Sequence, residues 1–171
     1  MSADLLAHFR LLARYNARAN ERLYDACARL PDAERKRPRP AFFHSIHGTL
    51  NHILLGDRIW MARFAGKTVP STGLDAILYE DFAALRSARR AEDAGIEAFV
   101  AALRPAFLAG SIRYLNHEGQ LHDDPLPLLL AHLFNHQTHH RGQVHNLLSQ
   151  TDVPPPSLDL HRVLRPDPVA S

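Results

Sequence analysis

"LLLAHLFNHQTHHRGQVHNLL", residues 128–148, decides the fold, because its apolar residues recur at helical spacing. On a wheel of about 100° per residue, one face collects Leu126, Leu129, Leu130, Leu133, Val144, Leu147 and Leu148. Asp124 and Pro125 are typical of a helix start. We therefore predict a helix over about 125–150 that packs against other helices through this apolar face.

The same stretch is rich in histidine, with five of the chain's 12: His132, His136, His139, His140 and His145. His140 falls inside the apolar stripe and His136 at its edge, and their i, i+4 spacing stacks them on one helix face. Two imidazoles so placed suit a shared metal ion. Gln137 stands where an H-E-x-x-H peptidase would carry its glutamate, which argues against that class. The alternative is that both are ordinary core and surface histidines.

A metal site needs at least a third ligand, and "FFHSIHGTLNHILLGDRIWMARF", residues 42–64, offers His44, His47 and His52. His47 lies at the edge of the main apolar face of this predicted helix. His52 points away from that face, toward a second apolar surface. Because the helix is apolar nearly all round, periodicity does not choose between His47 and His52.

The rest of the chain predicts three more long helices, over about 3–30, 42–65 and 75–108, the last bent or broken near Gly95. Residues 31–40, with "ERKRPRP", are expected to be a solvated connector. A short β-hairpin is expected within residues 111–125. These elements indicate an all-α four-helix bundle in a single domain over 1–171, with a core at 3–150 and a Pro-rich, mostly irregular tail at 151–171.

Composition narrows the function classes. A net charge of +2 and the lack of a basic stripe argue against nucleic-acid binding. The single cysteine, Cys27, excludes an internal disulfide and a cysteine zinc site. No apolar run is long enough to span a bilayer and the N-terminus does not look like a signal peptide, so we expect a cytoplasmic protein that does not bind membranes.

Several polar residues are candidates for the lining of a site. Asn16 and Asn20 follow the apolar stripe of the first helix, either as satisfied core amides or facing a polar cavity that contacts substrate. Asp57, just over one turn beyond His52, either orients a substrate or ligand imidazole or forms a salt bridge. Tyr15 is a candidate hydrogen-bond donor or a packing residue. A pocket above the metal lined by Asn16, Asn20 and Asp57 would favour catalysis.

Three segments in this order, "LLARYNARANERLY" (11–24), "TLNHILLGDRIWMARFAG" (49–66) and the histidine helix, resemble the DinB/YfiT-like family over about residues 3–150. The resemblance implies helices in up-down-down-up order and a divalent metal, nickel or zinc, held by three histidines. Carried across residue by residue, the ligands are His52, His136 and His140, which selects His52 over His47. The family pattern also includes Arg141 and Gln143, expected to anchor the helix end, the hairpin or a dimer contact.

The resemblance further implies a homodimer acting on a small molecule. Characterised relatives include S-transferases and isomerases that use thiols such as bacillithiol, mycothiol or glutathione. We therefore expect a metal-dependent transferase or hydrolase with a low-molecular-weight thiol as possible cosubstrate, because an open metal position lowers the pKa of a thiol or water. The alternative is a non-catalytic, stress-related protein that binds a metal or small molecule.

Overall fold

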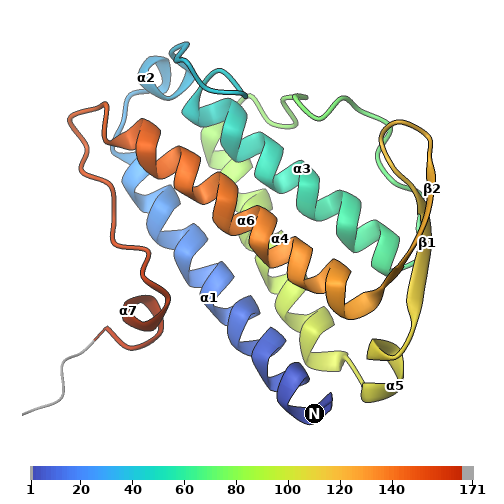
Figure 1. Cartoon of the computed structure of the whole chain (residues 1–171). Helices are drawn as coiled ribbons and strands as arrows, with labels where there is room; N and C mark the ends of the chain where they lie inside the picture. The colour runs from blue at the N-terminus through green and yellow to red at the C-terminus, as the bar shows by residue number, and fades with distance from the viewer. Residues whose placement is uncertain (1, 167–171) are drawn as a thin grey trace, which may run out of the picture.

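Four long helices build the molecule. The computed structural model describes residues 2–166, in which α1 (Ser2–Ala28), α3 (Ile46–Phe64), α4 (Phe82–Ala102) and α6 (Leu126–Leu148) pack side by side. Figure 1 shows α1 and α6 running toward the end of the bundle that carries α2, while α3 and α4 run away from it. This is the up-down-down-up order, and the predicted fold class is confirmed.

The helices form a ring in which α1 contacts α4 and α6, and α3 contacts the same two helices. Inside the ring the apolar core falls into two clusters. One lies around Phe9, Phe64 and Leu130, and the other around Leu23, Leu54 and Val144. Buried polar side chains occupy the bundle at the intervening positions of α1, α3, α4 and α6: Asn16, Asn20, Asp57, Arg89, Asp93, Gln137 and Arg141.

The second long helix starts later than predicted. It begins at Ile46, not near residue 42, because Ser45 caps it by accepting a hydrogen bond from the Gly48 amide at 2.9 Å. The residues before the cap form a turn in which His44 has a positive φ of 61°. This turn places Phe43 in the core while Phe42 stays 79% exposed.

The third long helix is shorter than predicted and is not broken at Gly95, which lies within it. Residues 67–81 form an irregular crossover, and α4 begins at Phe82 because the Asp81 carboxylate accepts from the Ala84 amide at 2.7 Å. The helix ends at Ala102, and a separate short turn, α5 (Pro105–Leu108), follows. The proline forbids the hydrogen bond that would continue α4.

The predicted hairpin is present as β1 (Ser111–Leu115) and β2 (Leu121–Pro125), paired antiparallel. Asp124 does not cap the last helix as expected. It belongs to β2 and accepts a hydrogen bond from the Tyr114 hydroxyl at 2.8 Å. The helix α6 follows at Leu126 with no side-chain cap.

The connector expected to be solvated is partly structured. Residues Asp32–Lys36 form a short helix, α2, and the Arg35 side chain is buried, with its guanidinium 4.3 Å from the centre of the Phe82 ring. An arginine can be buried in this way because its charge stays bonded to backbone carbonyls, here those of Cys27 and Leu30.

The tail lies along α1. Backbone carbonyls of Ser157 and Leu158 accept from side chains of α1, and that of Pro154 accepts from Arg29, just after its end. A short helix, α7 (Leu160–Leu164), buries Val163 against α1. The end of the predicted tail, residues 167–171, lies outside the described residues.

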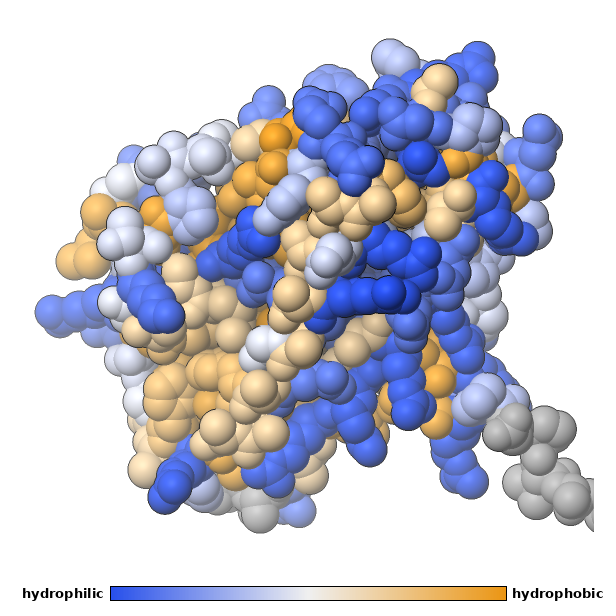
Figure 2. All heavy atoms as spheres, turned by 180° about the vertical axis from the view of Figure 1, so that it is seen from behind, coloured by the Kyte–Doolittle hydropathy of each residue, from blue (hydrophilic) through white to orange (hydrophobic). Residues whose placement is uncertain are grey.

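Across residues 2–166 no helix is long and apolar enough to span a membrane. On the face seen from behind, hydrophilic residues interrupt the apolar surface (Figure 2).

Candidate metal centre

Three histidines meet where α3 and α6 face each other. The Nε2 atom of His52 lies 3.2 Å from that of His136 and 3.1 Å from that of His140. Within residues 2–166 these three are the one group of His, Cys, Asp or Glu side chains whose ligand atoms all lie within 4.8 Å of one another. His47 is not part of the cluster, since its Nε2 bonds to the Tyr79 carbonyl at 2.8 Å.

The other nitrogen of two of these rings is engaged. His52 Nδ1 donates to the Leu74 carbonyl at 2.8 Å, and His140 Nδ1 donates to Gln143 Oε1 at 2.8 Å. Because a carbonyl oxygen only accepts, both rings carry their proton on Nδ1. In the neutral rings Nε2 therefore has a bare lone pair.

Burial keeps these rings neutral. It is the main cause that lowers the pKa of His136 to about 3 and that of His140 to about 4, and neighbouring histidines lower both further. Burial also lowers the pKa of His52, opposed by the Leu74 carbonyl. The lone pairs of His52 and His140 thus face each other at 3.1 Å with no proton between them.

This donor set fits a divalent metal. Rings bound to one ion at about 2.0–2.1 Å, with bond angles between about 90° and 109°, hold their nitrogens about 2.8–3.4 Å apart. The separations of His52 Nε2 from the other two Nε2 atoms, 3.1 and 3.2 Å, fall in this range. A cation between the lone pairs would replace their repulsion with three bonds. Neutral imidazole suits zinc, nickel, copper and iron.

The neighbours of the three rings shape the cluster. Phe43 stacks on His52 with ring centres 3.7 Å apart and meets His140 edge-on at 5.6 Å, so it covers one side. Gly56, one turn after His52, makes room for His136. A Cβ atom at Gly56 would lie only 2.7 Å from the Cε1 atom of His136.

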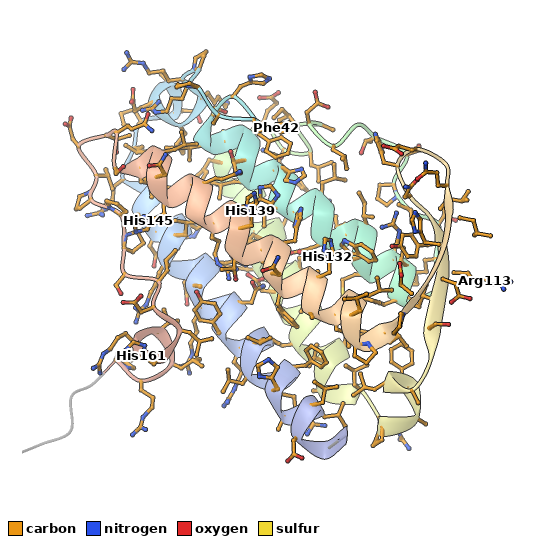
Figure 3. All side chains as sticks on the ribbon, viewed as in Figure 1. Phe42, Arg113, His132, His139, His145 and His161 are labelled. Carbon is orange, nitrogen blue, oxygen red and sulfur yellow. The ribbon has the colours of Figure 1, made fainter. Side chains whose placement is uncertain are left out.

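The side of the cluster at His52 and His136 opens into a pocket of about 470 Å³. It extends along the end of α3, the crossover, the hairpin and the start of α6. Its lining is formed by His52, Gly56, Ile59, Trp60, Arg63, Val69, Pro70, Thr72, Leu74, Tyr114, Leu115, Asn116, His117, His132 and His136. In Figure 3, His132 and His139 lie on the exposed side of α6.

Asn16, Asn20 and Asp57 do not line this pocket. All three belong to a buried network on the inner side of the bundle, which is one of the two alternatives that the sequence left open for each of them. Asp93 Oδ1 accepts from the amides of Asn20 at 2.9 Å and Asn16 at 3.3 Å. The satisfied-core interpretation of the two asparagines is the one the structure supports.

Arginines balance the acids of this network. Asp57 accepts from Arg89 at 2.5 Å and from the Gln137 amide, and Arg89 also pairs with Asp93 at 2.9 Å. Burial raises the pKa of Asp57 to about 7, and Arg89 opposes that rise. Asp57 therefore forms the alternative salt bridge, and it contacts neither a ligand imidazole nor the pocket.

Arg141 and Gln143 sit differently from expectation, whereas Tyr15 is a buried packing residue and a hydrogen-bond donor, as the sequence allowed. Arg141, expected at a helix end, hairpin or dimer contact, is buried and donates to Asn16 and Gln137. Tyr15 donates to the Leu158 carbonyl at 2.7 Å and so holds the tail instead of lining the site.

Gln143 holds His140, and its own amide donates to the exposed His139 at 3.1 Å. Sequence reasoning missed this role, along with those of Phe43 and Gly56. The i, i+3 spacing of His140 and Gln143 was the available signal for the first. The other two depend on contacts between segments, which leave no local pattern.

The chain is similar to known proteins over most of its length. A model of the DinB family matches residues 1–168. Protein DinB of Bacillus subtilis (strain 168) is 29% identical over 157 residues, which cover 81% of this chain and 83% of the relative. The crystal structure of a DinB-like protein from Bacillus cereus ATCC 10987 superposes with a TM-score of 0.61 at 20% identity, covering 81% of this chain and 89% of that one.

Proposed function

The chain belongs to the DinB family. On that premise we propose that it binds nickel or zinc through three histidines and uses the metal in a reaction of a small molecule. The observation that carries the proposal is the pair of Nε2 lone pairs, on His52 and His140, that face each other at 3.1 Å while their Nδ1 protons are fixed elsewhere.

The reaction class we propose is a thiol-dependent group transfer or a hydrolysis. A divalent cation with three neutral ligands keeps its full charge and, as a Lewis acid, lowers the pKa of a thiol or water beside it. The chain's own part is positional. Gln143 and the Leu74 carbonyl fix two rings, Phe43 shields one side of the cluster, and the pocket admits a reactant at His52 and His136.

The alternative is a protein that binds a metal or small molecule without catalysis. A structural metal is usually enclosed by four protein ligands, whereas a catalytic one keeps an open position. Here three side chains converge and a pocket adjoins two of them, which favours the catalytic proposal.

As partner we propose a second copy of the chain. Leu115 and Leu121, paired across the hairpin and more than half exposed, are compatible with such a contact.

Metal content tests the centre. Protein freed of any histidine tag is analysed by elemental mass spectrometry, wild type beside His52→Ala, His136→Ala and His140→Ala. The matched control is His145→Ala, on the same helix but at its far end (Figure 3). We expect near-stoichiometric nickel or zinc in wild type and His145→Ala, and little in the other three. Wild type that takes up neither metal would refute the proposal.

Activity and assembly are separate measurements. Metal-loaded wild type is assayed with a low-molecular-weight thiol and an aryl halide, and separately with an activated ester. If wild type accelerates either reaction and His136→Ala does not, the catalytic proposal is supported. If wild type binds metal but accelerates neither reaction, the non-catalytic alternative is supported. Light scattering coupled to size exclusion tests the homodimer, and a monomer mass at working concentration would contradict it.

A further inference from the structure

The pocket beside the three histidines is built along one face of α3. His52, Gly56, Ile59 and Arg63 follow one another at i, i+4, i+7 and i+11, so all four border the same space. At 1.5 Å per residue the Cα atoms of His52 and Arg63 lie about 16 Å apart along the helix. The pocket is therefore elongated, with the histidines toward one end and an arginine toward the other.

Arg63 is held firmly in this position. Its guanidinium carbon lies 4.5 Å from the centre of the Trp60 ring and 4.4 Å from that of Tyr114, and Nη2 donates to the Leu115 carbonyl at 2.9 Å. Stacking on Trp60, three residues earlier, shows that the side chain leans back toward the histidines. Two aromatic faces and a backbone bond thus fix the cation before any ligand arrives.

The charge of Arg63 is not neutralised. Within the part of the chain that the structure describes, no carboxylate lies within 4.0 Å of it, and its Nε is buried without a hydrogen-bond partner. No Asp or Glu stands among the described residues that line the pocket. A cation without a carboxylate partner favours a ligand that brings an anionic oxygen, so this end of the pocket suits an anion.

The middle of the pocket has a different character. Ile59, Val69, Pro70 and Leu74 contribute apolar surface to the lining that Arg63 and the histidines share. The Tyr114 hydroxyl is already bonded to Asp124, and Asn116 is occupied by the hairpin turn. A ligand that fills this space therefore needs an apolar body, and its anionic group belongs at Arg63.

We propose that this pocket binds an elongated small-molecule carboxylate, whose anionic end pairs with Arg63 and whose other end reaches the three histidines. The inference rests on the proposed function for the histidine end only. It assigns Arg63 as the residue that selects anionic ligands. The carboxylate belongs either to a thiol cosubstrate or to a second substrate without a thiol, and the choice of probes separates these two sources.

The test uses three probes of equal chain length: 6-mercaptohexanoate, 6-mercaptohexanamide and hexanoate. Affinity is measured by calorimetry, and emission of Trp60, the chain's single tryptophan, reports binding in this pocket. In wild type we expect the mercapto-carboxylate to bind about tenfold or more tightly than its neutral amide, the usual effect of one charge-assisted hydrogen bond. If wild type binds 6-mercaptohexanoate and 6-mercaptohexanamide equally tightly, the inference is overturned by this measurement alone.

Variants then assign the effect. Arg63→Gln is expected to remove the preference for carboxylate over amide, and Arg63→Lys to retain part of it. The matched control is Arg113→Gln, because Arg113 is exposed on the hairpin and points away from the bundle (Figure 3). It should behave as wild type. Arg63→Gln that keeps the full preference, with a wild-type melting temperature, would overturn the inference.

Metal-stripped protein separates this inference from the proposed function. Hexanoate has no metal-binding thiol, so its dependence on Arg63 should be the same with and without zinc, which would identify a thiol-free substrate as a fitting ligand. A gain from zinc that is confined to the mercapto-carboxylate would place the thiol end at the histidines. If the protein holds no metal but still prefers carboxylate through Arg63, the proposed function fails and the anion site stands.

Discussion

The substitution Gly56→Ala separates the metal site from the stability of the fold. The added Cβ would lie 2.7 Å from His136 Cε1 and 3.3 Å from its Nδ1. Carbon atoms in contact prefer about 3.5–4.0 Å, so the His136 ring must move by about 1 Å. Metal bonds tolerate only about 0.2 Å. A displaced ligand should therefore lower metal affinity by about 10–100-fold, as disturbed metal surroundings commonly do.

The metal-free fold should hardly suffer. His136 is half-buried and borders an open pocket, so its ring has space to move away. Replacing a helical glycine with alanine gains about 0.5–1 kcal/mol, which offsets the cost of the shift. We expect the free energy of unfolding of the metal-free variant to stay within about 1 kcal/mol of wild type. The stabilisation by saturating zinc should shrink by about 1.4–2.7 kcal/mol.

Two measurements check this prediction, a zinc titration against a chromophoric chelator and urea unfolding with and without zinc. The control is Gly95→Ala in α4, where the new Cβ meets nothing within 4 Å. It should keep wild-type zinc affinity and become slightly more stable. Gly56→Ala that binds zinc as tightly as wild type would refute the idea that this glycine makes room for a ligand.

Three further predictions concern the same region. The pKa values of His136 and His140 in the folded protein lie below the ordinary 6.5, so metal-free protein should lose stability as pH falls from about 6.5 toward 4. The loss should be at most about 1.4 kcal/mol per pH unit for each ring, before solvent screening reduces it. In urea unfolding, a variant with alanine in place of both histidines should lack this dependence on pH. Gln143→Leu should weaken zinc binding about 10–100-fold by freeing the His140 ring, while Gln143→Glu restores it, as measured by the chelator titration. Arg89→Met should destabilise by about 3–5 kcal/mol in urea unfolding by leaving buried carboxylates unpaired, whereas the exposed neighbour Arg90→Met should change stability by less than about 0.5 kcal/mol.

Local periodicity was sufficient to predict the last helix and to place His136 and His140 on one side of it, because the leucines and Val144 recur at helical spacing on either side of the pair. It was insufficient for α3, which is buried over most of its length, so that His47 and His52 looked alike. What distinguishes them is the chain they meet. His47 bonds to the Tyr79 carbonyl, whereas His52 bonds to the Leu74 carbonyl and turns its Nε2 toward α6.

The same contacts explain why the start of α4 was misplaced. Residues 75–81 contain apolar side chains that suit a helix, and Leu78 and Tyr79 do pack on the core. Their backbone, however, is held in irregular form by α3, since Asn51 Oδ1 accepts from the Tyr79 amide at 3.0 Å. A polar side chain in one helix thus determines the shape of a segment 28 residues later. The hydropathy of residues 75–81 alone therefore cannot predict this hydrogen bond.

The buried charges and the histidine cluster are best understood together. On α6 each candidate ligand is followed at once by a member of the network, His136 by Gln137 and His140 by Arg141. Adjacent residues point about 100° apart, so bonds from Gln137 and Arg141 to α1 and α3 fix the rotation of α6 about its axis. That rotation aims the two histidines at α3.

An apolar core alone would hold α6 less specifically, because hydrophobic contact is non-directional. Leu133 and Val144 could be buried in several slightly rotated positions at similar free energy, whereas hydrogen bonds to Asp57 and Asn16 are satisfied in one. Loosening the network should therefore weaken metal binding even where no histidine is touched. The residues that looked like candidates to line the site contribute from behind it, by setting the direction in which the ligands point.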